Sequence, residues 1–199
     1  MKEIGVLKDN EVRWAENVLL VDGDYIDHVA FDLTVNFERM LERRIPQADL
    51  AHWLDCIALD GGVREGDNET QVIFLHKKDG LANFNPSDYT DINGMAFKDN
   101  LGEFAMSAYK VEDLVSIEDF FTQTLDLLLG AEEVKRIVLV PNAEHYINSV
   151  KHSLRNTSKA CTVLSMQPFT GGNCRQEILG YSLMSALGIR SEEIVLKVN

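Results

Sequence analysis

The sequence predicts an α/β fold, specifically a three-layer α/β/α sandwich around a mostly parallel sheet. Short apolar runs without alternation, at residues 18–21 and 136–140, have the pattern of strands that are covered on both faces. After the first run the apolar spacing changes to steps of three and four residues, which is typical of an amphipathic helix. Strands that alternate with helices require crossover connections, and such connections produce a mostly parallel sheet with helices on both faces.

The same alternation continues along the chain. The first helix is expected to begin near Asp24 as its N-cap and to end before Pro46, whose ring disfavours a helical residue before it. A second helix carries Leu50 and Trp53 on its apolar face and ends at Gly61. The remaining predicted strands are residues 71–76, 103–110, 136–140 and 160–166, and the remaining predicted helices are residues 116–129, 143–155 and 174–187.

Residues 77–101 interrupt this pattern. They are polar and contain several turn signals, including Asp79-Gly80 and Asn93-Gly94. A connection of this length is unusual in a compact domain, so we expect a flexible flap or an insertion here. The length of 199 residues otherwise fits a single domain that covers residues 1–199.

The amino-acid composition indicates which classes of molecule the protein can bind. The chain has 19 Lys+Arg and 32 Asp+Glu, which gives a formal net charge of −13, and 45% of its residues are hydrophobic. This apolar content is enough for a full core and excludes a disordered chain. Binding to nucleic-acid backbones or anionic membranes requires clustered Lys and Arg, so the acidic balance disfavours both. We therefore expect a protein partner or a homo-oligomer.

The cysteines and the N-terminal residues indicate a cytoplasmic protein. Cys56, Cys161 and Cys174 are odd in number and far apart, which predicts reduced thiols and no zinc site. The first ten residues carry charges where a signal peptide needs an apolar core. The longest apolar run, residues 18–21, is far shorter than a membrane-spanning helix.

Carboxylates follow three of the predicted strands. Asp22 and Asp24 come after the first strand, Asp113 after the third and Glu144 after the fourth. Ligands of parallel sheets bind beyond the carboxyl ends of the strands, and converging carboxylates hold Mg²⁺ or Mn²⁺. These four residues are therefore candidate metal ligands.

Each of these acids also has a structural interpretation. Asp24 as an N-cap explains its position without any metal. Asp113 and Glu144 lie near predicted helix starts, where a carboxylate opposes the helix dipole favourably. Both interpretations stay open from the sequence alone.

Three short motifs resemble the NYN branch of the PIN-like ribonucleases. They are Val-Asp-Gly-Asp at residues 21–24, Lys-Val-Glu-Asp at residues 110–113, and Leu-Val-Pro-Asn-Ala-Glu-His-Tyr at residues 139–146. The resemblance covers about residues 18–166. It implies a Rossmann-like (PIN-like) sheet and acids at the three strand ends that bind a divalent metal for RNA cleavage.

The resemblance also implies a degenerate member of that family. Asp22 matches the first family acid, and Asp113 matches the acid of the Lys-x-x-Asp motif. The two family aspartates at the fourth strand correspond to Ala143 and His145, and Glu144 lies between them. The loss of two carboxylates leaves too little charge to hold the metal in the usual way.

Two functions follow from these observations. The first is a binding or interaction module that has the PIN-like fold without nuclease activity. The alternative is an Mg²⁺- or Mn²⁺-dependent phosphodiesterase of ribonuclease type. Its metal ligands would be Asp22, Asp24, Asp113 and Glu144, of which Asp22, Asp113 and Glu144 also act in catalysis, and Lys110 would steady a phosphate.

Overall fold

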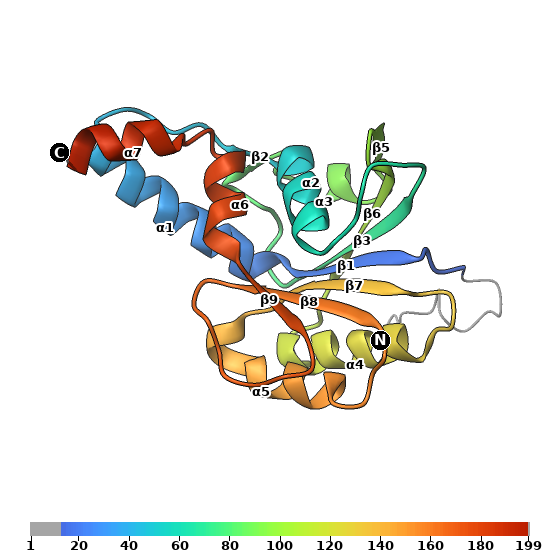
Figure 1. Cartoon of the computed structure of the whole chain (residues 1–199). Coiled ribbons are helices and arrows are strands. Elements are labelled where there is room, and N and C mark those ends of the chain that lie inside the picture. Colours follow the sequence, from blue (N-terminus) through green and yellow to red (C-terminus); the bar gives the residue numbers. More distant parts are fainter. Residues whose placement is uncertain (1–12, 199) are drawn as a thin grey trace.

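The computed structural model describes residues 13–198 and has a mixed α/β fold with a mostly parallel central sheet, as the sequence predicts (Figure 1). The strands of this part are β1 (Asn17–Asp22), β2 (Ala48–Asp49), β3 (Glu69–His76), β4 (Phe84–Asn85), β5 (Ala96–Asp99), β6 (Gly102–Lys110), β7 (Arg136–Val140), β8 (Ala160–Ser165) and β9 (Arg175–Ile178). Its helices are α1 (Gly23–Leu41), α2 (Leu50–Asp60), α3 (Tyr89–Ile92), α4 (Ile117–Gly130), α5 (Ala143–Leu154), α6 (Leu179–Ala186) and α7 (Ser191–Val198).

The central sheet has the strand order β5-β6-β3-β1-β7-β8-β9. β5 pairs antiparallel with β6, and every other neighbouring pair in this sheet is parallel. β2 and β4 form a separate short parallel pair. The chain thus builds the main sheet outward from β1, first toward β6 and then toward β9.

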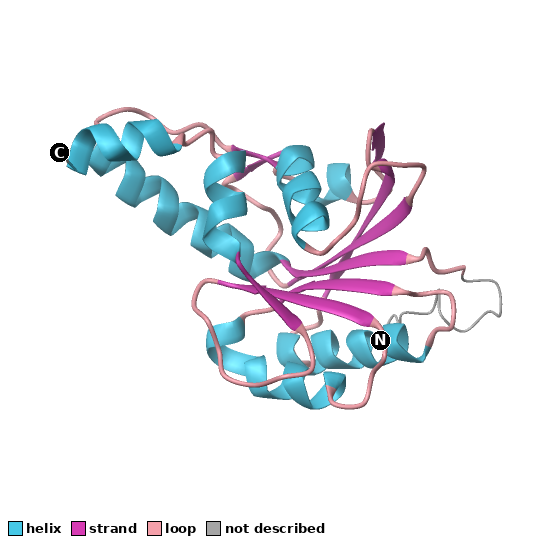
Figure 2. Cartoon of the chain, viewed as in Figure 1, coloured by secondary structure: helices cyan, strands magenta, loops and turns pink. Residues whose placement is uncertain are grey.

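β1 supplies side chains to two hydrophobic clusters. Leu19 and Val21 belong to a cluster that includes residues of α1, α2 and α6, here called the α1 cluster. Val18 and Leu20 belong to a cluster that includes residues of α4 and α5, here called the α4 cluster. Figure 2 shows these two groups of helices on opposite sides of the strands. Alternate residues of a strand point to opposite faces, so the unbroken apolar run of β1 reflects burial on both.

The ends of α1 differ from the expected ones. Asp22, and not Asp24, is the N-cap, because its side chain accepts a hydrogen bond from the Tyr25 backbone N–H at 3.1 Å. The helix ends well before Pro46, at a left-handed Glu42 with φ of 54°. The Asp22 carboxyl is therefore fixed by the geometry of the β1–α1 turn.

Residues 77–101 form an insertion that packs against the α1 cluster. The segment contains β4, α3 and β5, and the Asp27 carboxylate of α1 accepts a hydrogen bond from the Asn83 backbone N–H at 2.8 Å. Its buried hydrophobic side chains are Leu81, Phe84, Tyr89, Ile92 and Leu101. The insertion is therefore part of the hydrophobic core.

The helix expected over residues 174–187 is wrong in its first part. Arg175–Ile178 forms the strand β9, and the helix α6 begins only at Leu179. β9 pairs in parallel with β8, from Thr162 opposite Arg175 onward. This pairing satisfies backbone groups along the outer side of β8, which the helical apolar spacing of the sequence does not reveal.

Two further expectations can be compared with the structure. No helix within residues 13–198 combines the length and the apolar character needed to cross a membrane. Cys56, Cys161 and Cys174 are all free thiols, as their spacing predicts.

Candidate functional site

The carboxyl ends of β1, β3, β6 and β7 lie at one edge of the sheet. The register places Asp22 beside Leu75 of β3, and His76 of β3 beside Lys110 of β6. In open parallel sheets, ligands bind beyond this edge at the point where the strand order reverses. The order reverses at β1, since β3 lies on one side of it and β7 on the other. Asp22 is therefore at the reversal point.

Asp22 is buried and hydrogen-bonded through both carboxyl oxygens. Only 2% of its surface is exposed. Oδ1 accepts from the Tyr25 backbone N–H, and Oδ2 accepts from the Tyr146 hydroxyl at 2.6 Å. Burial raises the pKa of Asp22 to about 6, against the opposing effect of the two hydrogen bonds. A carboxyl with this pKa can change protonation state near neutral pH.

Asp24 has a structural role in this geometry. Its Oδ2 accepts from the Lys77 backbone N–H at 2.9 Å, and its Oδ1 accepts from the Lys78 backbone N–H at 3.2 Å. These bonds hold the start of the 77–101 segment against the first turn of α1. Both oxygens of Asp24 are thus engaged by backbone donors.

Lys110 pairs with an acid that the sequence did not single out. Its Nζ lies 2.6 Å from Asp79 Oδ1, and both side chains are largely exposed. This hydrogen bond lowers the pKa of Asp79 and raises the pKa of Lys110. Asp113 lies exposed beyond the end of β6.

Glu144 is exposed in the first turn of α5. Burial first, and then the negative charges of Glu144 and Asp22, raise the pKa of Tyr25. Two residues after Glu144 the backbone leaves helical geometry at Tyr146, where φ is −137° and ψ is 28°. Glu144 and Asp22 therefore both lie close to Tyr25, and the Tyr146 hydroxyl reaches Asp22 from an interrupted helix.

The four predicted ligands are not gathered as one group within the described part of the chain. No group of three or more His, Cys, Asp or Glu side chains within residues 13–198 is arranged to hold a metal ion. Each oxygen of Asp22 and Asp24 accepts one hydrogen bond from the protein, and these bonds fix the direction of both carboxylates. The residues present do not fit a divalent cation without rearrangement.

Sequence reasoning missed the aromatic residues around Asp22. The Tyr89 hydroxyl is buried and has no hydrogen-bond partner within residues 13–198, and the buried Tyr25 hydroxyl faces Glu144. The Tyr89 ring stacks on His76 with centroids 3.6 Å apart, and burial lowers the pKa of His76. Tyr25 and Tyr146 lie inside or beside the strand-end motifs and could have been noticed there. Tyr89 comes from the insertion, and nothing in the sequence connects it with Asp22.

The fold and the site define a mixed α/β protein with a buried carboxyl beside several tyrosines, at the carboxyl end of an inner strand of a mostly parallel sheet. The chain belongs to the family of unknown function DUF6621, whose model matches residues 11–194. No curated protein and no solved structure matches the chain.

Proposed function

We propose that this protein is a degenerate PIN/NYN-like member with a three-layer α/β/α arrangement, which acts as a binding or interaction module without nuclease activity. The strand order supports the Rossmann-like part of this proposal. Counted in chain order, the six parallel strands run 3-2-1-4-5-6, the order of the doubly wound dinucleotide-binding fold. The two hydrophobic clusters on opposite faces of the sheet support the three layers.

One observation supports the proposal that the protein has no nuclease activity. The carboxylates of the first motif are used inside the protein: Asp22 accepts from Tyr146 and from the α1 backbone, and Asp24 accepts from the backbone after β3. A two-metal phosphodiesterase needs several carboxylates that converge on its cations, and no such group is arranged within residues 13–198.

Exposed apolar side chains support an interaction role. Phe31 lies near the middle of α1 and Val35 in its outer half, and Leu196 and Val198 lie on α7. Figure 1 shows this half of α1, together with α7, extending away from the sheet. Exposed apolar side chains often take part in protein contacts, so we expect a protein partner or a second copy of the chain.

The proposal is tested by metal binding and hydrolysis together. Melting temperature is measured with and without millimolar MgCl₂ or MnCl₂, for the wild type and for Asp22→Asn, and cleavage of single-stranded RNA is followed in the same buffers. We expect no hydrolysis and no metal-specific shift in either protein. Metal-dependent cleavage that Asp22→Asn abolishes would contradict the proposal.

The alternative is the Mg²⁺- or Mn²⁺-dependent phosphodiesterase with Asp22, Asp24, Asp113 and Glu144 as ligands and Lys110 as a phosphate contact. The raised pKa of Asp22 favours it, because perturbed carboxyls concentrate at functional sites. It requires the four carboxylates, which are not gathered as one ligand group within residues 13–198, to converge on the cation.

A self-association assay tests the interaction role. Light scattering gives the solution mass of the wild type and of a Phe31→Ser/Leu196→Ser variant. If the partner is a second copy, the wild type is larger than a monomer and the variant is monomeric. A monomeric wild type would exclude the homo-oligomer and leave the protein partner.

A further inference from the structure

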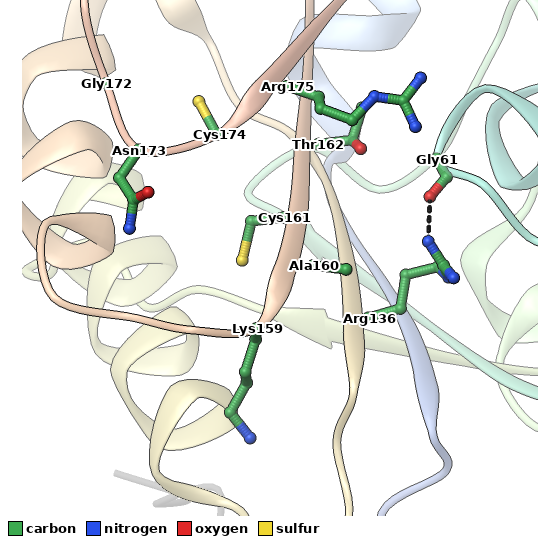
Figure 3. Close-up of a pocket in the computed structure, with 10 residues that line it drawn as sticks. All are labelled: Gly61, Arg136, Lys159, Ala160, Cys161, Thr162, Gly172, Asn173, Cys174 and Arg175. Atoms are coloured by element: carbon green, nitrogen blue, oxygen red, sulfur yellow. Dashed lines mark hydrogen bonds between the residues drawn. The ribbon is translucent and has the colours of Figure 1, made fainter.

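A cavity of about 390 Å³ lies at the end of the sheet opposite to Asp22 (Figure 3). It is formed where β7, β8 and β9 begin and where α2 ends, so it is distant from the strand-end carboxylates along every parallel strand. Its basic lining residues are Arg136, Lys159 and Arg175. Three cations around one cavity are notable in a chain with a net charge of −13.

Two of these cations converge on one glycine. A Cβ atom built on Gly62 would lie 2.5 Å from Arg136 Nη1 and 3.7 Å from Arg175 Nη1. The two guanidinium nitrogens are therefore at most about 6.2 Å apart, although the groups carry like charges. In Figure 3 both arginine side chains are directed toward the turn at Gly61, whereas Lys159 points away from them.

The partners of these arginines leave part of their charge uncompensated. Arg136 Nη1 donates to the Gly61 carbonyl at 2.8 Å, and within residues 13–198 no carboxylate pairs with it. Arg175 Nη2 lies 3.2 Å from Glu177 Oε1. Arg175 also opposes the rise in the pKa of Asp60 that burial and Glu177 cause. The carboxylates of Glu177 and Asp60 thus balance the charge of Arg175. Within the described residues, the charge of Arg136 is met by the Gly61 carbonyl and by no carboxylate.

We infer that this cavity binds an oxyanion, specifically the phosphate group of a small molecule, between Arg136 and Arg175. A guanidinium presents several N–H donors in one plane, which matches two oxygens of a phosphate. Arg136 uses Nη1 for the Gly61 carbonyl and keeps its other donors for a ligand. A cavity of this volume accommodates a phosphate with a small organic group. Glu177 and Asp60 beside Arg175 limit the affinity, so we expect millimolar binding.

This inference does not depend on the proposed function. The cavity lies at the opposite edge of the sheet from Asp22, and none of its lining residues belongs to the strand-end site. Loss of phosphate binding would therefore leave the interaction role unaffected, and the reverse also holds.

The experiment is calorimetric titration of the full chain with inorganic phosphate and, separately, with glycerol 3-phosphate, in a buffer of low ionic strength. Sodium chloride at equal ionic strength is the salt control. We expect saturable binding that Arg136→Met weakens at least tenfold. Arg136→Lys, which keeps the charge and loses the planar fork, should also weaken it. Tighter binding of glycerol 3-phosphate would identify an organic phosphate as the ligand, and equal binding would identify free phosphate.

Arg64→Met is the matched control. Arg64 also donates to backbone carbonyls, those of Leu59 and Val63, but it does not line this cavity. Its replacement should leave binding unchanged. Equal losses in Arg64→Met and Arg136→Met, or heats no larger than those of sodium chloride, would overturn the inference. A melting curve of each variant shows whether it is folded, and a folded Arg136→Met that binds like the wild type would overturn the inference as well.

Discussion

The protonation of Asp22 makes the stability of the protein depend on pH. Asp22 is 2% exposed, and burial raises its pKa from the ordinary value of 3.8 to about 6. One unit of pKa shift corresponds to about 1.4 kcal/mol, so the shift of roughly two units amounts to about 3 kcal/mol. The folded state keeps a proton that the unfolded state loses. The free energy of unfolding therefore falls as the pH rises from about 4 through about 6, and it stays lower above that.

Asp22→Asn removes this dependence. The amide is neutral at every pH, its oxygen can accept from the Tyr25 backbone N–H, and its NH₂ can donate to the Tyr146 hydroxyl. We expect the stability of the variant relative to the wild type to rise between pH 4 and pH 7, by up to about 3 kcal/mol. Urea unfolding of both proteins at several pH values measures this difference.

Asp126→Asn is the control for net charge, because Asp126 is exposed on α4. A constant offset between Asp22→Asn and the wild type would report only a change in hydrogen bonding. A difference that does not change with pH, or a wild type that gains on the variant as the pH rises, would refute the raised pKa of the buried Asp22.

Three other substitutions test nearby contacts. Asp24→Ala should cost about 1–3 kcal/mol, since two backbone N–H groups lose their acceptor, and hydrogen exchange should quicken at those two amides after β3. Gly23→Ala should lower the melting temperature, because the added Cβ would lie 2.0 Å from the Tyr89 hydroxyl; an unchanged value would contradict this packing. Asp55→Asn should stabilise the protein above neutral pH in urea titrations, because burial and Asp99 raise the pKa of Asp55 to about 7; a loss of stability there would contradict it.

The apolar patterns of the sequence predicted most of the fold. The runs at residues 18–21 and 136–140 became β1 and β7, because strands covered on both faces have a recognisable composition. The apolar spacing of residues 174–187 predicts a helix throughout, but Arg175–Ile178 forms the short edge strand β9, which pairs with β8. Local spacing carries no information about a neighbouring strand.

The candidate site was only partly predictable. The sequence located Asp22 at a strand end but could not show that Tyr146 would donate to it, since the two are 124 positions apart. Asp24 was expected as a helix cap or a metal ligand, and its contacts with Lys77 and Lys78 arise from the path of the insertion. Tertiary hydrogen bonds of this kind depend on how the elements pack, and no motif encodes them.

The central place of β1 has a consequence for synthesis and folding. β1 is made before its two neighbours in the sheet, β3 and β7, and β7 is made last of the three. Until Arg136 and the residues after it have been made, one edge of β1 has no strand to pair with, and its Val18 and Leu20 side chains lack the part of the α4 cluster that α5 supplies. An unpaired apolar edge is prone to aggregation. A nascent or truncated chain that stops before β7 would therefore expose its most hydrophobic strand, and the complete sheet requires nearly the whole sequence.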